Sequence, residues 1–153
     1  MLRAATAFVL ACALAHQAGA CLHETTAQIE GRYGRSTKPA QAQPGEEARE
    51  YRYKDFIVIV TFVEGKSAQE LFVHQDFKSP LSDSEIQSLL DMNSLGQRWE
   101  KSPDIPVWSL GGDDPHTWVA LAAYFPKSPQ YVAPGLGIMT ADYAKKHGFM
   151  PNI

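Results

Sequence analysis

The most constraining feature of this sequence is an almost uninterrupted run of β-branched and aromatic residues at 56–63, FIVIVTFV. The turn sequence Glu64-Gly65-Lys66 follows it, and residues 68–77 then alternate between apolar and polar side chains. This order predicts a β-hairpin within the stretch 51–77. Its first strand is apolar on both faces, so both sides of that strand have to be covered in the folded protein.

The segment 1–20 has the composition of a signal peptide. Arg3 supplies a positive charge, and residues 4–15 form an apolar core shorter than the roughly 20 residues that span a bilayer. Ala18-Gly19-Ala20 then fits the small-residue rule for cleavage. We therefore expect export, and a mature single domain over residues 21–153.

The mature chain begins at Cys21, its only cysteine, because Cys12 lies in the signal peptide. This arrangement excludes an intrachain disulfide. The sequence Ala18-Gly19-Ala20-Cys21 resembles the lipobox of bacterial lipoproteins, although alanine stands at position 18 where leucine is usual. The resemblance implies acylation of Cys21 and, with Leu22 after it, an outer-membrane address. Ordinary signal-peptidase cleavage would instead leave a free periplasmic or secreted protein, and both alternatives stay open.

Composition excludes two classes of partner. The chain has 14 basic and 17 acidic residues, a net charge of −3, and no Lys/Arg run of the kind that nucleic acid requires. Beyond the signal peptide, apolar segments such as 118–125 have only the length of a strand. We therefore expect no nucleic-acid partner, and contact with a membrane only through a lipid on Cys21.

Further elements are predicted on both sides of the hairpin. Residues 22–34 have the apolar period of an amphipathic helix, and Ser82 with Glu85 forms a capping box that starts a helix over residues 83–93. Residues 35–50 contain two prolines and no large apolar side chain, which predicts a mobile loop. The remaining predictions are strands at 106–110 and 118–125, an extended or looped segment at 130–140 and a terminal helix at 141–147.

These elements predict an α+β fold. We expect a two-layer sandwich, in which an antiparallel sheet of about four to five strands carries the helices on one face. The strand at 118–125 is the expected neighbour of the hairpin, and no internal repeat is apparent in the sequence. The second apolar face of the hairpin would need the C-terminal loops or a partner to cover it. Its candidate residues are Ile57, Ile59, Val63, Leu71 and Val73.

The helix pattern at 24–34 followed by the strand and turn at 56–66 resembles the N-terminal part of small exported bacterial proteins. More loosely, it is similar to the outer-membrane lipoproteins of the SmpA/OmlA type. The resemblance covers less than half of the chain and involves residues of structural rather than catalytic types. It implies a place in the bacterial envelope.

Two groups of residues are candidates for catalysis or metal binding. His74 and Asp76 share one face of a strand, where the carboxylate could orient the imidazole as a general base. Asp113, Asp114 and His116 offer donors to a divalent ion, although Gly-Gly-Asp-Asp-Pro is typical of a turn. The sequence lacks a G-x-S-x-G elbow and an H-E-x-x-H motif. We predict no catalytic residue, metal or cofactor, and keep a small secreted hydrolase or metal-dependent enzyme as the alternative.

Trp99, Trp108 and Tyr131 are candidates for a binding surface, because tryptophan and tyrosine are frequent at interfaces. Packing inside the domain is the competing explanation for such rings. The sequence therefore predicts an exported, non-enzymatic binding or envelope-associated protein, with a protein partner in the envelope. It predicts neither the ligand nor the oligomeric state.

Overall fold

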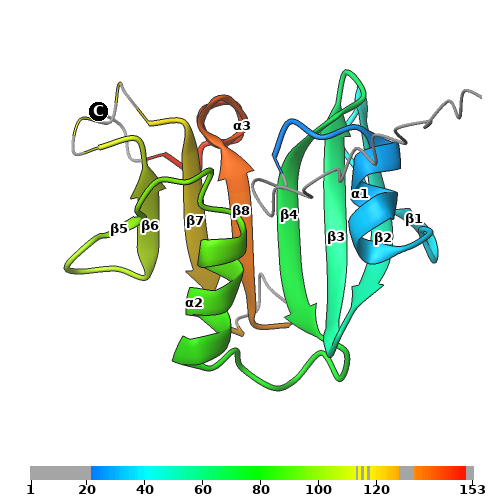
Figure 1. Ribbon diagram of the computed structural model, residues 1–153, viewed down its shortest axis with the longest axis horizontal. Helices are drawn as coiled ribbons and strands as arrows, with labels where there is room; N and C mark the ends of the chain where they lie inside the picture. Colours follow the sequence, from blue (N-terminus) through cyan, green and yellow to red (C-terminus); the bar gives the residue numbers. More distant parts are fainter. Residues whose placement is uncertain (1–21, 113, 115, 117, 128–132, 151–153) are drawn as a thin grey trace, which may run out of the picture.

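The computed structural model describes residues 22–112, 114, 116, 118–127 and 133–150. The eight strands within these residues form one antiparallel sheet in the order β1-β2-β3-β4-β8-β7-β6-β5, accompanied by two longer helices and one shorter helix (Figure 1). The elements in chain order are α1 (Thr26–Tyr33), β1 (Lys38–Ala40), β2 (Glu46–Tyr53), β3 (Phe56–Val63), β4 (Lys66–His74), α2 (Asp83–Met92), β5 (Glu100–Lys101), β6 (Val107–Leu110), β7 (Ala120–Phe125), β8 (Gly135–Thr140) and α3 (Ala141–Lys146).

One order of elements, a helix followed by four strands, occurs twice along the chain. α1 precedes β1 to β4, and α2 precedes β5 to β8. The two halves meet in the middle of the sheet, where β4 pairs with β8. α1 and α2 lie in front of the same face of the sheet, each over its own half (Figure 1). The fold is therefore a structural duplication that the sequence did not reveal.

The two long helices start with the same local device. In α1, the side chain of Thr25 accepts from the Gln28 N–H and the Gln28 side chain accepts from the Thr25 N–H. Ser82 and Glu85 form the same reciprocal pair at the start of α2. The predicted helix at 83–93 is thus confirmed. The predicted helix at 22–34 is shorter than expected, since the backbone of residues 23 and 24 hydrogen-bonds Ser67 at the start of β4.

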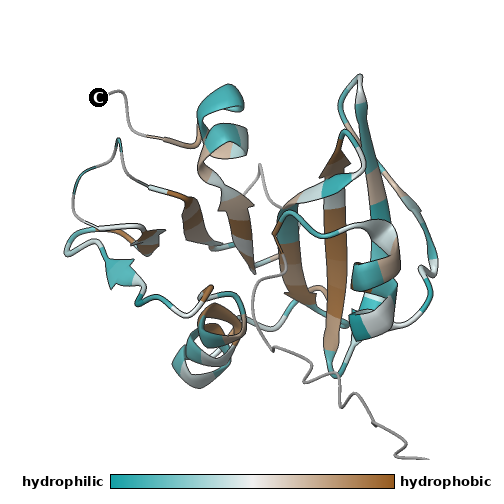
Figure 2. Ribbon diagram, turned by 45° about the horizontal axis from the view of Figure 1, so that its top comes forward, coloured by the Kyte–Doolittle hydropathy of each residue, from teal (hydrophilic) through white to brown (hydrophobic). Residues whose placement is uncertain are grey.

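The main core lies between the sheet and the two long helices. Alternate residues of β3 point into it, as the hairpin pattern predicted, and strands β3, β4, β7 and β8 carry most of the hydrophobic residues (Figure 2). Ile29 of α1 and Leu90 of α2 are almost fully buried against this face. The strand members that share this core are Tyr51, Phe56, Val58, Val60, Phe62, Phe72, Trp108, Leu110, Ala120, Ala122, Leu136 and Ile138.

α3 packs on the opposite face of the sheet. Its residues Tyr143 and Ala144 contact Leu121 and Met139, which alternate along their strands with residues of the main core. A buried carboxylate on β2 adds a polar tie. The side chain of Glu46 is 1% exposed and lies 3.1 Å from Lys146 Nζ and 2.8 Å from His147 Nε2. The tie joins the first half of the chain to the helix that follows the second half.

The expected two-layer sandwich is wrong. The sheet has eight strands rather than four or five, and α3 lies on the face away from α1 and α2. The predicted mobile loop at 35–50 contains β1 and the first part of β2. β8 comes from the segment predicted to be extended or looped, and it takes the place beside β4 that was expected for 118–125.

The missed strands depend on tertiary contacts that a local pattern does not contain. β2 pairs with β3 along its whole length, and this pairing orders a segment of low hydrophobicity. β8 was not predicted because it contains two glycines, which are unusual inside a strand. The neighbouring residues leave no room for a side chain at either position. A Cβ at Gly135 would lie 2.8 Å from Phe72 O, and one at Gly137 would lie 2.9 Å from the ring of Phe125.

The second face of the hairpin is partly covered within the chain. Ile57 and Val73 are 3% and 4% exposed. Ile59, Val63 and Leu71 are half-buried. This face therefore does not present a large exposed apolar surface among the described residues of β3 and β4.

Glu46→Ala tests the tie between β2 and α3. The free energy of unfolding is expected to fall by about 1–3 kcal/mol, because hydrogen bonds to a buried charged group are lost. Urea denaturation measures this loss, and hydrogen exchange is expected to show faster opening of α3. Glu47→Ala is the matched control, since the Glu47 side chain is 59% exposed and its removal should cost below about 0.5 kcal/mol. Equal losses in the two variants would contradict the role given to Glu46.

Candidate functional site

Two of the three predicted binding residues lie at one cleft. Trp99 and Trp108 contribute to a cleft of about 930 Å³ between the outer side of α2 and the strands β5 and β6. Tyr131 lies outside the residues that the structure describes. The cleft has the size of typical small-molecule sites, which range over about 300–1,000 Å³. It is formed entirely by the second half of the chain.

The two tryptophan rings are held rigidly in the wall of the cleft. Trp99 is 9% exposed, and its indole N–H donates to the carbonyl oxygen of Leu90 in α2 at 2.7 Å. Trp108 is 8% exposed on β6, and the ammonium of Lys101 lies 5.6 Å from the centre of its ring. The competing prediction of core packing is therefore correct for most of each ring. Only a small part of each ring faces the cleft.

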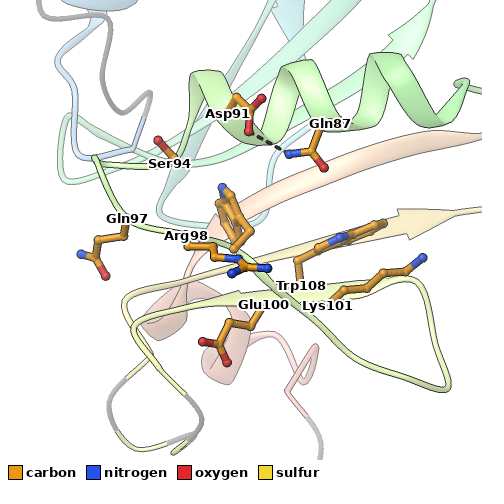
Figure 3. Close-up of a pocket in the computed structure, with 9 residues that line it drawn as sticks. Gln87, Asp91, Ser94, Gln97, Arg98, Glu100, Lys101 and Trp108 are labelled. Atoms are coloured by element: carbon orange, nitrogen blue, oxygen red, sulfur yellow. Dashed lines mark hydrogen bonds between the residues drawn. The ribbon is translucent and has the colours of Figure 1, made fainter.

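Charged and polar side chains surround these rings, as Figure 3 shows. From α2, Gln87 donates to Asp91 at 2.8 Å, so these two side chains are oriented as a pair. Arg98 lies on the opposite side of the cleft, where it makes no ion pair or hydrogen bond with any residue that the structure describes. Within the described part of the chain, the cleft thus holds an exposed guanidinium without an ionic partner.

His74 and Asp76 do not form a catalytic pair. His74 Nε2 lies 3.4 Å from the carboxylate of Glu85, and its ring packs on Phe56 at 5.1 Å between centres. Asp76 accepts hydrogen bonds from the Ser79 hydroxyl and from the backbone N–H groups of Lys78 and Ser79. The Ser79 side chain above all, together with these backbone bonds, lowers the pKa of Asp76 to about 2. The carboxylate is therefore engaged in a turn.

In the second candidate group, the described residues Asp114 and His116 make a hydrogen bond that is typical of a turn. Asp114 accepts from the backbone N–H of His116 at 3.0 Å, and Asp113 lies outside the described residues. Asp114 and His116 precede Ala120, the first residue of β7. His74 follows Val73, which is paired with Gly135, and Gly135 is in turn paired with Phe125, the last residue of β7. His74 thus lies at the opposite end of the sheet from the described residues Asp114 and His116. Within the described ranges, no three His, Cys, Asp or Glu side chains form a group that could hold a metal.

A buried acidic cluster lies under α1, away from the cleft. Glu70 of β4 is 0% exposed, and one of its carboxyl oxygens accepts from the Tyr33 hydroxyl at 2.8 Å. Its other oxygen has no hydrogen-bond partner. Burial raises the pKa of Glu70 to about 8, against the weaker opposing effects of Tyr33 and Arg32. Glu70 is therefore largely protonated at neutral pH.

Glu24 and Arg32 form the outer part of this cluster, with 2.6 Å between the guanidinium and the carboxylate. Their side chains are only 16% and 20% exposed, and burial raises the pKa of Glu24 to about 6. The negative charge of Glu24 raises the pKa of Glu70 further. Because Glu70 is fully buried and bonded to Tyr33, we interpret the cluster as structural.

Sequence reasoning missed Arg98, Lys101, Asp91 and Gln87 as parts of the cleft. Gln87 and Asp91 lie on the polar side of α2, and such a side of a helix is normally expected to face solvent. Glu70 did leave a signal in the sequence, since it falls on the same strand face as the apolar Phe72. A charged residue at such an alternating position indicates a buried ionisable group.

Comparison with known proteins gives little further information. No protein-family model and no curated protein matches the sequence. Among solved structures, the chain is similar to a cysteine-rich secretory protein from Staphylococcus aureus, with 9% sequence identity and a TM-score of 0.44. The match covers 80% of this chain and 46% of that chain, so this chain spans about half the length of that protein. A likeness at this level carries no argument about function.

Of the helices in the described part of the chain, none has both the length and the apolar character needed to cross a membrane.

The raised pKa of Glu70 predicts a pH dependence of stability. Because the folded pKa of about 8 exceeds the ordinary value of 4.5, the unfolded chain releases the proton first as pH rises. The stabilising contribution of protonated Glu70 is complete below about pH 4.5 and is lost as pH rises to about 8. We expect the free energy of unfolding to fall across this window, by on the order of 2–4 kcal/mol.

Glu70→Gln isolates this contribution, since glutamine has the shape of the protonated acid and does not titrate. The variant is expected to lose most of the fall between pH 5 and pH 8 in urea denaturation series. Tyr33→Phe provides a second comparison, because it removes the donor to Glu70 and keeps the ring. An unchanged pH profile in Glu70→Gln would contradict a buried proton on this residue.

Proposed function

We propose that this chain is an exported, non-enzymatic binding protein of the cell envelope, and that its ligand occupies the cleft beside α2. One observation carries the proposal. The cleft combines two largely buried tryptophan rings with an oriented Gln87–Asp91 pair and with Arg98, which has no ion pair with any described residue. Sites for small molecules combine aromatic area with polar groups that fix the orientation of the ligand, and this cleft is richer in polar groups than most such sites.

Binding is favoured over catalysis by the positions of the candidate groups. The imidazole of His74 faces Glu85, and the carboxylate of Asp76 caps its own turn. Neither residue lines the cleft. An Asp-oriented general base requires the two groups within hydrogen-bond reach of each other and of a substrate. The contacts of His74 and Asp76 therefore give the hydrolase alternative no support.

The proposed address follows from the N-terminal sequence. Residues 1–20 have the pattern of a signal peptide, and Cys21 follows a small-residue cleavage site. Leu22, the next residue, is buried, and His23 donates its backbone N–H to Ser67 at 2.7 Å. A lipid on Cys21 would therefore hold the start of β4 close to the membrane surface. Without a lipid, the same protein would be periplasmic or secreted.

Mass spectrometry of the protein purified from its own cells tests the address. The expected mature chain begins at Cys21, because the cleavage rule places the cut after Ala20. An added mass of acyl groups on Cys21 would indicate the lipoprotein, and an unmodified cysteine would indicate the free form. Recovery of a chain that still begins at Met1 would contradict export by cleavage.

Tryptophan fluorescence tests the binding function. The mature protein is titrated with a panel of amino acids, short peptides, and neutral and acidic oligosaccharides. At least one class is expected to change the emission, since Trp99 and Trp108 adjoin the site. Trp108→Phe should lose most of that change. Trp118→Phe is the matched control, because Trp118 donates to Gly112 and does not line the cleft. A panel without any response would contradict the proposal.

A further inference from the structure

We infer that the cleft binds a sugar chain bearing carboxylate groups. This inference rests on the proposed binding function and adds the chemical class of the ligand. It depends on three features of the cleft: the balance of polar and aromatic lining residues, two cations without an ion pair among the described residues, and the directions of the acidic side chains.

The lining is polar at seven of its nine residues, and the other two are Trp99 and Trp108. An apolar ligand would bury these polar groups without partners, which costs free energy. A sugar ring meets both kinds of surface, because its hydroxyl groups form hydrogen bonds and its C–H face packs on an aromatic ring. The small exposed area of each tryptophan suits such a limited apolar face.

Two cations favour an acidic sugar over a neutral one. Arg98 has no ion pair or hydrogen bond with any described residue, and the Lys101 ammonium contacts only the ring of Trp108 in that part of the chain. A guanidinium binds a carboxylate through two parallel hydrogen bonds, and this geometry is specific for planar anions. A carboxylate would therefore find its natural partner at Arg98, with Lys101 as a second positive charge.

The acidic residues leave room for this anion. Figure 3 shows the Glu100 side chain pointing away from the other labelled side chains. Asp91 lies across the cleft on α2, where it is paired with Gln87 and can accept from sugar hydroxyls. Over the whole lining Arg98 and Lys101 are balanced by Asp91 and Glu100, so the attraction for a single carboxylate comes from the position of Arg98 and not from a net charge. A polyphosphate would be repelled by the two carboxylates of the lining, Asp91 and Glu100.

Isothermal titration calorimetry with a matched pair of probes tests the inference. Tetragalacturonate carries the carboxylates, and its methyl ester has the same sugar chain without charge. We expect the acid to bind at least about tenfold more tightly than the ester, because charge-assisted hydrogen bonds are lost in the ester. Added salt should weaken binding of the acid and leave the ester unchanged.

Arg98→Gln is expected to reduce the affinity for the acid at least about tenfold and to leave the affinity for the ester unchanged. Arg98 is exposed, so circular dichroism should show an intact fold in this variant. Lys127→Gln is the matched control, because it removes an exposed cation that does not line the cleft. Equal losses in both variants would indicate a general charge effect and overturn the role of Arg98.

The outcomes separate the inference from the function on which it rests. Equal binding of acid and ester would overturn the carboxylate preference and leave a saccharide-binding protein. Failure of both probes, with a response to another class in the fluorescence panel, would overturn the ligand class and leave the binding function. Failure of both probes and of the whole panel would overturn both proposals.

Discussion

The pairing of β4 with β8 is the constraint on which the rest of the structure depends. It joins two helix-and-four-strand halves into one sheet, and it brings α1 and α2 over a common core. The pairing requires close backbone approach, because a side chain at Gly135 would collide with the backbone of Phe72. Gly135, which is paired with Val73 of β4, thus bears directly on whether the halves can meet.

The sequence predicted the parts of the fold that depend on local chemistry. The hairpin of β3 and β4 follows from the alternation around Glu64-Gly65-Lys66, and α2 follows from the capping box of Ser82 and Glu85. The central strand β8 could not be predicted in this way, since glycines lower β-propensity and are justified only by neighbours distant in sequence. The duplication could not be predicted either, because the two halves share the order of their helices and strands but no repeated sequence.

The candidate site was predictable only in its aromatic part. Trp99 and Trp108 were candidates because of their residue type, but nothing in the sequence places Arg98 opposite α2. That placement depends on the turn after α2 and on the pairing of β5 with β6. His74 and Asp76 show the opposite case. Their spacing permits a catalytic pair, which the sequence offered as an alternative, but in the structure His74 contacts Glu85 and Asp76 bonds its own turn. Spacing along a strand fixes the face of a residue and does not fix its partner.

The two faces of the sheet are stabilised by buried acids in different ionisation states. Glu70 under α1 keeps its proton because burial dominates and one oxygen lacks a partner. Desolvation also acts on Glu46, but hydrogen bonds from Lys146 and His147 hold the pKa of this carboxyl below its ordinary value. The number of donors around each carboxylate therefore decides which form is buried.

The duplicated order has a consequence for how the chain can be cut and rejoined. His23, at the start of the described chain, shares a cavity of about 340 Å³ with Tyr143 and Lys146 of the last helix. The start of the described chain thus lies beside α3, the helix that follows the second half. With a linker from the segment after α3 to His23, opening the chain between β4 and α2 would give a circular permutant in which the second half precedes the first.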